Sequence, residues 1–211
     1  MQRLDEIGER IRQHLEEKNA ARDRALQQSR TLIRHCSLAI RAAHRDERAE
    51  AQAELAAAST LQAELRTNLA GFPDLYHAGY TQDALKEYVE ANIVCAILGG
   101  EPLPAPEAVG VENAAYLCGL GEAAGELRSR VLDILRHGRN AEAERLMAVM
   151  DDIYGLLVTM DFPDALTGNL RRITDMVRGV VERTRGDLTT TSQQEDLKRA
   201  LRSLEEKLPR P

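Results

Sequence analysis

The feature that most constrains the fold is the near absence of any β-strand pattern. Runs that alternate Val, Ile or Thr with polar residues do not occur, and Ala, Leu, Glu and Arg dominate the sequence. Because these four residues favour helices, we predict an all-α protein. The 211 residues fit a single domain, 1–211. Because the predicted helices follow one another with mostly short connections, we expect them to form an antiparallel bundle.

Glycines, prolines and capping residues divide the sequence into seven predicted helices. The first, over 4–44, is longer than a small bundle covers, so we expect part of it to pack on another subunit. Spaced prolines make 101–110 a linker in which no helix is expected. Thr81 is the predicted N-cap of the third helix, and Gly186 the predicted end of the sixth. The seven helices are expected at about 4–44, 46–69, 81–99, 111–137, 140–161, 167–185 and 191–208.

Composition excludes several classes of protein. No apolar run reaches the roughly 18 residues of a membrane span, and the charged N-terminus is unlike a secretory signal. The three cysteines (Cys36, Cys95 and Cys118) are far apart in the sequence, which excludes a disulfide framework and a zinc knuckle. We therefore expect a cytoplasmic protein with no membrane partner.

The formal net charge of −6 conceals a basic segment. Residues 18–45 hold seven Lys or Arg and one Asp, a net charge of +6, so the remainder carries −12. On a helix, four of these arginines would share one face, opposite an apolar face: Arg30, Arg34, Arg41 and Arg45. Arginine suits bidentate contacts with phosphate. The face is thus a candidate nucleic-acid-binding surface, and the alternative is a solvated helix face in an Arg-rich chain.

Four glutamates form two pairs on consecutive predicted helices. Glu87 and Glu90 are spaced i, i+3, and Glu122 and Glu126 are spaced i, i+4, so each pair shares a helix face. If the pairs meet across the bundle, four carboxylates suit Mg²⁺ or Mn²⁺. Such ions activate water and stabilise charge on a phosphodiester. The alternative is that these are salt-bridged or exposed helix acids.

Other chemistries lack their motifs. A di-iron or di-manganese bundle needs Glu-x-x-His pairs, and no histidine in the sequence is preceded by Glu at that spacing. Gly-rich phosphate loops and a Gly-x-Ser-x-Gly elbow are also missing. The glycines at 119, 121 and 125 lie within a predicted helix and are interpreted as packing positions.

Three long blocks, in order, resemble the translin/Trax family. They read YHAGYTQDALKEYVEA (76–91), YLCGLGEAAGELRS (116–129) and IYGLLVTMDFPDALTGNLRRITDMVRGVVERTRGDL (153–188). The resemblance extends over about 20–188 and includes the long basic first helix. It implies an all-α, seven-helix translin-like fold that assembles into a hollow homo-oligomer, typically an octamer, around single-stranded or short RNA.

The resemblance also implies an activity, since Trax-like members are metal-dependent endoribonucleases. Their carboxylates fall, motif by motif, on Glu87, Glu90, Glu122 and Glu126, which the helix spacing had already singled out. Glu122 stands where the Trax pattern has Asp, and is one methylene longer. The competing interpretation is a non-catalytic, translin-like oligomer that binds single-stranded RNA or DNA. A third is a helical scaffold whose basic face only makes subunit salt bridges.

Overall fold

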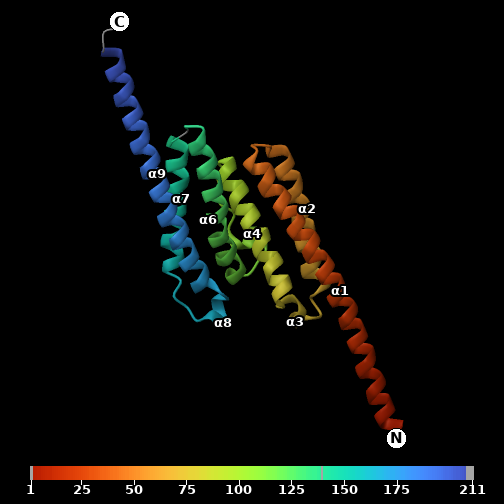
Figure 1. Cartoon of the computed structure of the whole chain (residues 1–211). Helices are drawn as coiled ribbons and strands as arrows, with labels where there is room; N and C mark the ends of the chain where they lie inside the picture. The colour runs from red at the N-terminus through yellow and green to blue at the C-terminus, as the bar shows by residue number, and fades with distance from the viewer. Residues whose placement is uncertain (1, 139, 208–211) are drawn as a thin grey trace. The chain divides into compact units, whose positions relative to one another are not determined.

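A computed structural model describes residues 2–138 and 140–207, and every regular element in these ranges is a helix. The all-α prediction is therefore confirmed. The helices in chain order (Figure 1) are α1 (Gln2–His44), α2 (Arg48–Asn68), α3 (Pro73–Tyr76), α4 (Gly79–Gly99), α5 (Pro106–Val109), α6 (Asn113–Arg136), α7 (Asn140–Val158), α8 (Asp164–Thr167) and α9 (Leu170–Lys207). None of the described helices is long and apolar enough to cross a membrane.

The chain forms two compact units, Met1–Gly119 and Leu120–Pro211. Helix α6 begins in the first unit and continues into the second. The single domain expected from the sequence stays a prediction.

In the first unit, α1 packs on both α2 and α4, and α2 also packs on α4 (Figure 1). The inner face of α1 carries Leu32, Cys36 and Ala39, each with 0% of its surface exposed. The N-terminal part of α1 extends beyond the end of α2 (Figure 1), and its apolar side chains Leu4 and Ile11 are exposed. The second half of α1 is thus packed, whereas Leu4 and Ile11 near its N-terminal end are left exposed.

In the second unit, α9 is the element on which both α7 and α8 pack. Its buried side chains recur at helical spacing, with Val177 and Thr184 fully buried and Leu188 nearly so. Helix α6 comes so close that a Cβ at Gly121 would collide with Ile173 of α9. Burial of a helical stripe is the main source of stability for such a unit.

The described ranges hold nine helices instead of the predicted seven, and the largest difference is α9. The sequence predicted a helix end at Gly186, whereas α9 continues through it to Lys207. A single glycine costs a helix only about 1 kcal/mol relative to alanine. Because Thr184 and Leu188 are buried on either side of it, tertiary packing outweighs that cost. The predicted stop at Pro209 lies outside the described residues.

The linker over 101–110 contains a one-turn helix, α5, where the spaced prolines predicted none. Pro106 begins it, in the first turn, where a backbone N–H would have no acceptor within the helix, and Gly110 ends it with φ +67°. The predicted cap Thr81 is also wrong, since α4 starts at Gly79. The Thr81 hydroxyl donates instead to the carbonyl of Leu75, at 2.9 Å. Two more one-turn helices, α3 and α8, were not predicted. Each has only four residues, which is too short for a helical repeat of apolar residues to be seen in the sequence.

Candidate metal centre and nucleic-acid face

Helix α4 contributes two of the four predicted carboxylates, and it is a deeply buried helix. Leu85 and Val94 have no exposed surface, Glu90 is only 8% exposed, and Glu87 is half-buried. The negative charge of these glutamates reaches the inner face of α1. Burial raises the pKa of the Cys36 thiol, and the carboxylates of Glu87 and Glu90 raise it further. Glu90 is therefore buried in the first unit, and Glu87 is partly so.

Helix α6 packs closely against α4 at Gly119. A Cβ built on Gly119 would lie 2.6 Å from the carbonyl oxygen of Lys86 and 2.7 Å from Cβ of Val89. Real Cβ atoms do not come that close, so only glycine allows the two backbones this approach. Glu122 follows three residues later on the same continuous helix, on a neighbouring surface position.

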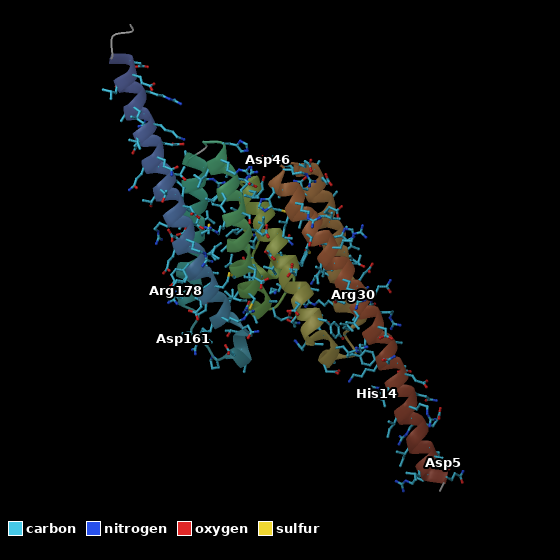
Figure 2. All side chains as sticks on the ribbon, viewed as in Figure 1. Asp5, His14, Arg30, Asp46, Asp161 and Arg178 are labelled. Carbon is cyan, nitrogen blue, oxygen red and sulfur yellow. The ribbon has the colours of Figure 1, made fainter. Side chains whose placement is uncertain are left out.

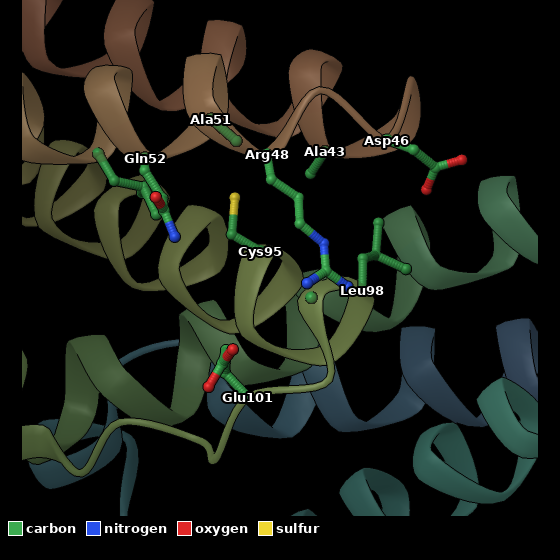
Figure 3. Close-up of a pocket in the computed structure, with 10 residues that line it drawn as sticks. Ala43, Asp46, Arg48, Ala51, Gln52, Cys95, Leu98 and Glu101 are labelled. Carbon is green, nitrogen blue, oxygen red and sulfur yellow. The ribbon is translucent and has the colours of Figure 1, made fainter.

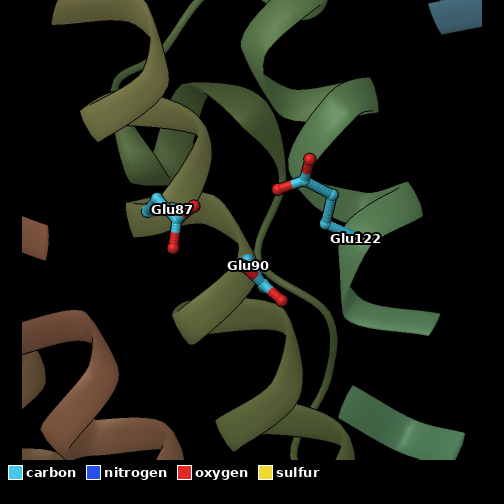
Figure 4. A group of neighbouring side chains, drawn as sticks. All are labelled: Glu87, Glu90 and Glu122. Atoms are coloured by element: carbon cyan, nitrogen blue, oxygen red, sulfur yellow. The ribbon is translucent and has the colours of Figure 1, made fainter. Parts of the chain in front are cut away.

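Three of the four predicted ligands come together. Glu87, Glu90 and Glu122 can each offer one carboxylate oxygen so that all three oxygens lie within 4.8 Å of one another (Figure 4). Ionised carboxylates at such separations repel, and a divalent cation offsets that repulsion. An all-oxygen donor set of this kind is what Mg²⁺ and Mn²⁺ prefer. The residues present therefore fit such an ion.

Glu126 is not a member of that group. It lies one turn beyond Glu122 on α6 and is half-buried, and its role as a ligand stays a prediction. Between the two glutamates, Gly125 has no described atom within 4 Å of where its Cβ would be. The interpretation of Gly119 and Gly121 as packing positions is confirmed. For Gly125 it stays a prediction.

The arginine face of α1 is exposed as the helical pattern predicted. Arg30 (labelled in Figure 2), Arg34 and Arg41 are all exposed, opposite a buried face that includes Cys36 and Ile40. No ion pair joins these three arginines to another residue in the described ranges. Three guanidinium groups on one helix face are thus available to an anionic partner.

Arg45 differs from the other three. It lies just past the end of α1, and its guanidinium donates to Glu47 at 2.6 Å through Nε and approaches Glu50 to 3.7 Å. The hydrogen bond from Arg45 lowers the pKa of Glu47. An anionic ligand would have to compete with these carboxylates.

A small pocket lies near the α1–α2 turn, which also contains Arg45. Figure 3 shows Cys95 in it, together with Arg48, Leu98 and Glu101. The Cys95 thiol is a weak donor to the Ala39 carbonyl at 3.7 Å, and burial raises its pKa to about 11. A protonated thiol is a poor nucleophile and a poor metal ligand.

Known proteins match this chain over nearly its whole length. No model of a protein family matches it. An uncharacterised protein of Methanocaldococcus jannaschii is 32% identical over 204 residues, which are 96% of this chain and 90% of that protein.

Solved structures share the fold closely. The crystal structure of AfC3PO is 34% identical with a TM-score of 0.81, and covers 88% of this chain and 97% of its own. A structure of AfC3PO in complex with duplex RNA, also 34% identical, gives a TM-score of 0.76 over 88% and 96% of the two chains. Apo-NeC3PO, at 22% identity, gives a TM-score of 0.74 over 89% and 96%, and supports the fold alone.

The likeness of this chain to the C3PO structures, in fold and in sequence, defines a protein of the translin/Trax type, and the resemblance noted in the sequence is confirmed. The chain belongs to the translin/Trax-like family that includes C3PO.

Proposed function

We propose that this protein is a metal-dependent endoribonuclease that cleaves single-stranded or short RNA inside a hollow oligomer of its own copies. The observation that carries the proposal is the group formed by Glu87, Glu90 and Glu122 on the fold of C3PO. A structure of AfC3PO with duplex RNA supports RNA as the partner.

The carboxylates of Glu87, Glu90 and Glu122 would hold Mg²⁺ or Mn²⁺, with Glu126 as the fourth predicted ligand. When bound, such an ion supplies an activated water and a positive charge for the oxyanion of the phosphodiester. The burial of Glu90 on α4 keeps its side chain in one position, which favours a preorganised site.

The exposed arginines of α1 would hold the RNA backbone. With a rise of about 1.5 Å per residue, Arg30 and Arg34 are spaced about 6 Å along the helix axis, and Arg34 and Arg41 about 10 Å. Backbone contacts position a strand without reading its sequence, so we expect weak sequence preference. Single-stranded DNA would bind the same face.

A homo-octamer is the expected assembly, with the arginine face turned inward. The charge distribution supports this assembly: the basic segment carries +6 and the remainder −12 by the sequence. In a hollow oligomer the basic helix would face the interior and the acidic remainder the solvent. The three free thiols suit a reducing, cytoplasmic location.

The deciding experiment incubates the purified protein with short single-stranded RNA in Mg²⁺ and in EDTA. We expect cleavage only with the metal, and its loss in Glu87→Gln and Glu122→Gln. Glu144→Gln is the matched control, because Glu144 is an exposed acid on α7. Metal-independent cleavage, or full activity in both site variants, would contradict the proposal.

The second candidate is a non-catalytic oligomer that binds single-stranded RNA or DNA. The complex of AfC3PO with duplex RNA favours it, because a similar chain binds RNA there. This candidate predicts binding that survives loss of the carboxylates and weakens in Arg34→Ala and Arg41→Ala. A purely structural scaffold would show no RNA affinity at moderate salt.

A further inference from the structure

Helix α6 carries three glycines within seven residues, and they have different surroundings. At Gly119 a Cβ would meet the Lys86 carbonyl at 2.6 Å, and at Gly121 it would collide with Ile173. At Gly125 no described atom beyond its chain neighbours and the adjacent backbone of α6 lies within 4 Å of the Cβ position. Close packing therefore explains the first two glycines and leaves the third unexplained.

The fold gains nothing from glycine at position 125. The residue lies in the middle of α6, next to the fully buried Ala124, and its φ is not positive. Alanine there would stabilise a helix by about 1 kcal/mol relative to glycine. Glycine therefore makes α6 less stable than alanine would, and a functional requirement at this position would explain why glycine is present.

Gly125 adjoins the candidate metal centre. Residues three and four apart are neighbours on a helix surface, so Gly125 lies between Glu122 and Ser129. The Ser129 side chain is exposed, and its hydroxyl donates to the Gly125 carbonyl at 3.4 Å. The surface of α6 thus runs from a carboxylate, across a half-buried residue that has no side chain, to a hydroxyl.

We infer that Gly125 is a substrate-clearance position: its missing side chain leaves room for the RNA strand that continues from the phosphate at Glu122. The inference rests on the proposed function. In this arrangement the strand continues from the phosphate at the carboxylates along α6, so that its next nucleotide lies against the turn that contains Gly125. Gly125 is a positioning residue, because it admits the substrate and takes no part in the chemistry.

The test compares Gly125→Ala and Gly125→Leu with Gly186→Leu. Gly186 is the matched control because it also lies inside a long helix with no described atom within 4 Å of its Cβ position. Leu and Ala are both good helix formers, so stability should not fall. For the Leu variant we expect kcat/KM for short single-stranded RNA to drop roughly tenfold to a hundredfold.

Most of that loss should appear in KM, since the side chain excludes substrate. The Ala variant should lose less than the Leu variant. Affinity for Mn²⁺ alone, measured by calorimetry, and the assembly mass from light scattering should match the unaltered protein.

Different results would contradict the inference about Gly125 and the proposed nuclease activity. Unchanged kcat/KM in Gly125→Leu, or an equal loss in Gly186→Leu, would overturn the inference and leave the nuclease proposal standing. Loss of Mn²⁺ affinity, or a changed assembly mass, would also overturn it, because the position would then serve the metal site or a subunit contact. No cleavage by the unaltered protein would overturn the proposed function and this inference together.

Discussion

At the scale of single residues, the arginines of the basic face are not equivalent. Arg34 and Arg41 are exposed without an ion pair to any described residue, whereas Arg45 is held by Glu47 and Glu50. We expect Arg34→Ala and Arg41→Ala each to weaken binding of single-stranded RNA and to lower the salt slope by about 0.7. Arg45→Ala should change both less, because its guanidinium must first leave two carboxylates.

Fluorescence anisotropy with a labelled short RNA at several salt concentrations measures both quantities. Arg3→Ala is a suitable control, because Arg3 is exposed on the same helix outside the basic segment. An effect of Arg45→Ala as large as that of Arg34→Ala would show that the carboxylates do not compete with RNA.

A second residue-scale prediction concerns Cys95, whose pKa burial raises from 9.0 to about 11. In the unfolded chain the thiol ionises near its ordinary value, while in the folded protein it keeps its proton. The unfolded state therefore binds fewer protons between these values, and stability falls as pH rises from about 9 through about 11.

Urea unfolding of the unaltered protein and of Cys95→Ala between pH 8 and pH 11 tests this. The variant should lose less free energy of unfolding over that range, whatever its stability at pH 8. Parallel pH dependence in the two proteins would contradict the assigned cause.

At the scale of helices, the contact of α6 with α4 depends on Gly119. We expect Gly119→Ala to lower the free energy of unfolding by about 1–3 kcal/mol, because the methyl group would force the two backbones apart. It should also weaken Mn²⁺ binding, since Glu122 follows one turn later. Gly155→Ala is the control: no described atom lies near its Cβ position, so it should gain up to about 1 kcal/mol.

Urea denaturation and calorimetry with Mn²⁺ measure the two effects. A Gly119→Ala protein as stable as the Gly155→Ala protein would mean that α6 and α4 can separate at no cost.

Helices were predictable from the sequence where their signals are local. The end of α4 at Gly99 and the turn at Gly100, with φ +76°, follow from glycine itself, and the length of α1 follows from periodicity. The end at Gly186 was predicted wrongly because burial of Thr184 and Leu188 is a tertiary property. In the same way, spacing placed Glu87 and Glu90 on one face but did not reveal that a Cβ at Gly119 would collide with α4 whereas one at Gly125 would meet no other described element.

At the scale of the whole molecule, the N-terminal part of α1 presents an apolar stripe. Leu4, Ile11 and Leu15 lie within about 40° on a helical wheel and are 69%, 55% and 56% exposed. This part extends beyond α2 (Figure 1), so the first unit does not cover it. Exposed apolar stripes of this kind mark contacts with other chains, as the length of the predicted first helix had indicated.

We therefore expect light scattering to give the unaltered protein a mass several times the 23.4 kDa of one chain. Replacing Leu4, Ile11 and Leu15 together by Ser should lower that mass while the helical circular dichroism changes little, because these side chains contribute little to the packing of their own unit. Replacing Arg3, Arg10 and Gln13 by Ser, on the same segment, is the matched control and should leave the mass unchanged. A stable monomer in the unaltered protein would contradict the proposed hollow oligomer. An unchanged mass in the triple apolar variant would place the subunit contacts elsewhere on the chain.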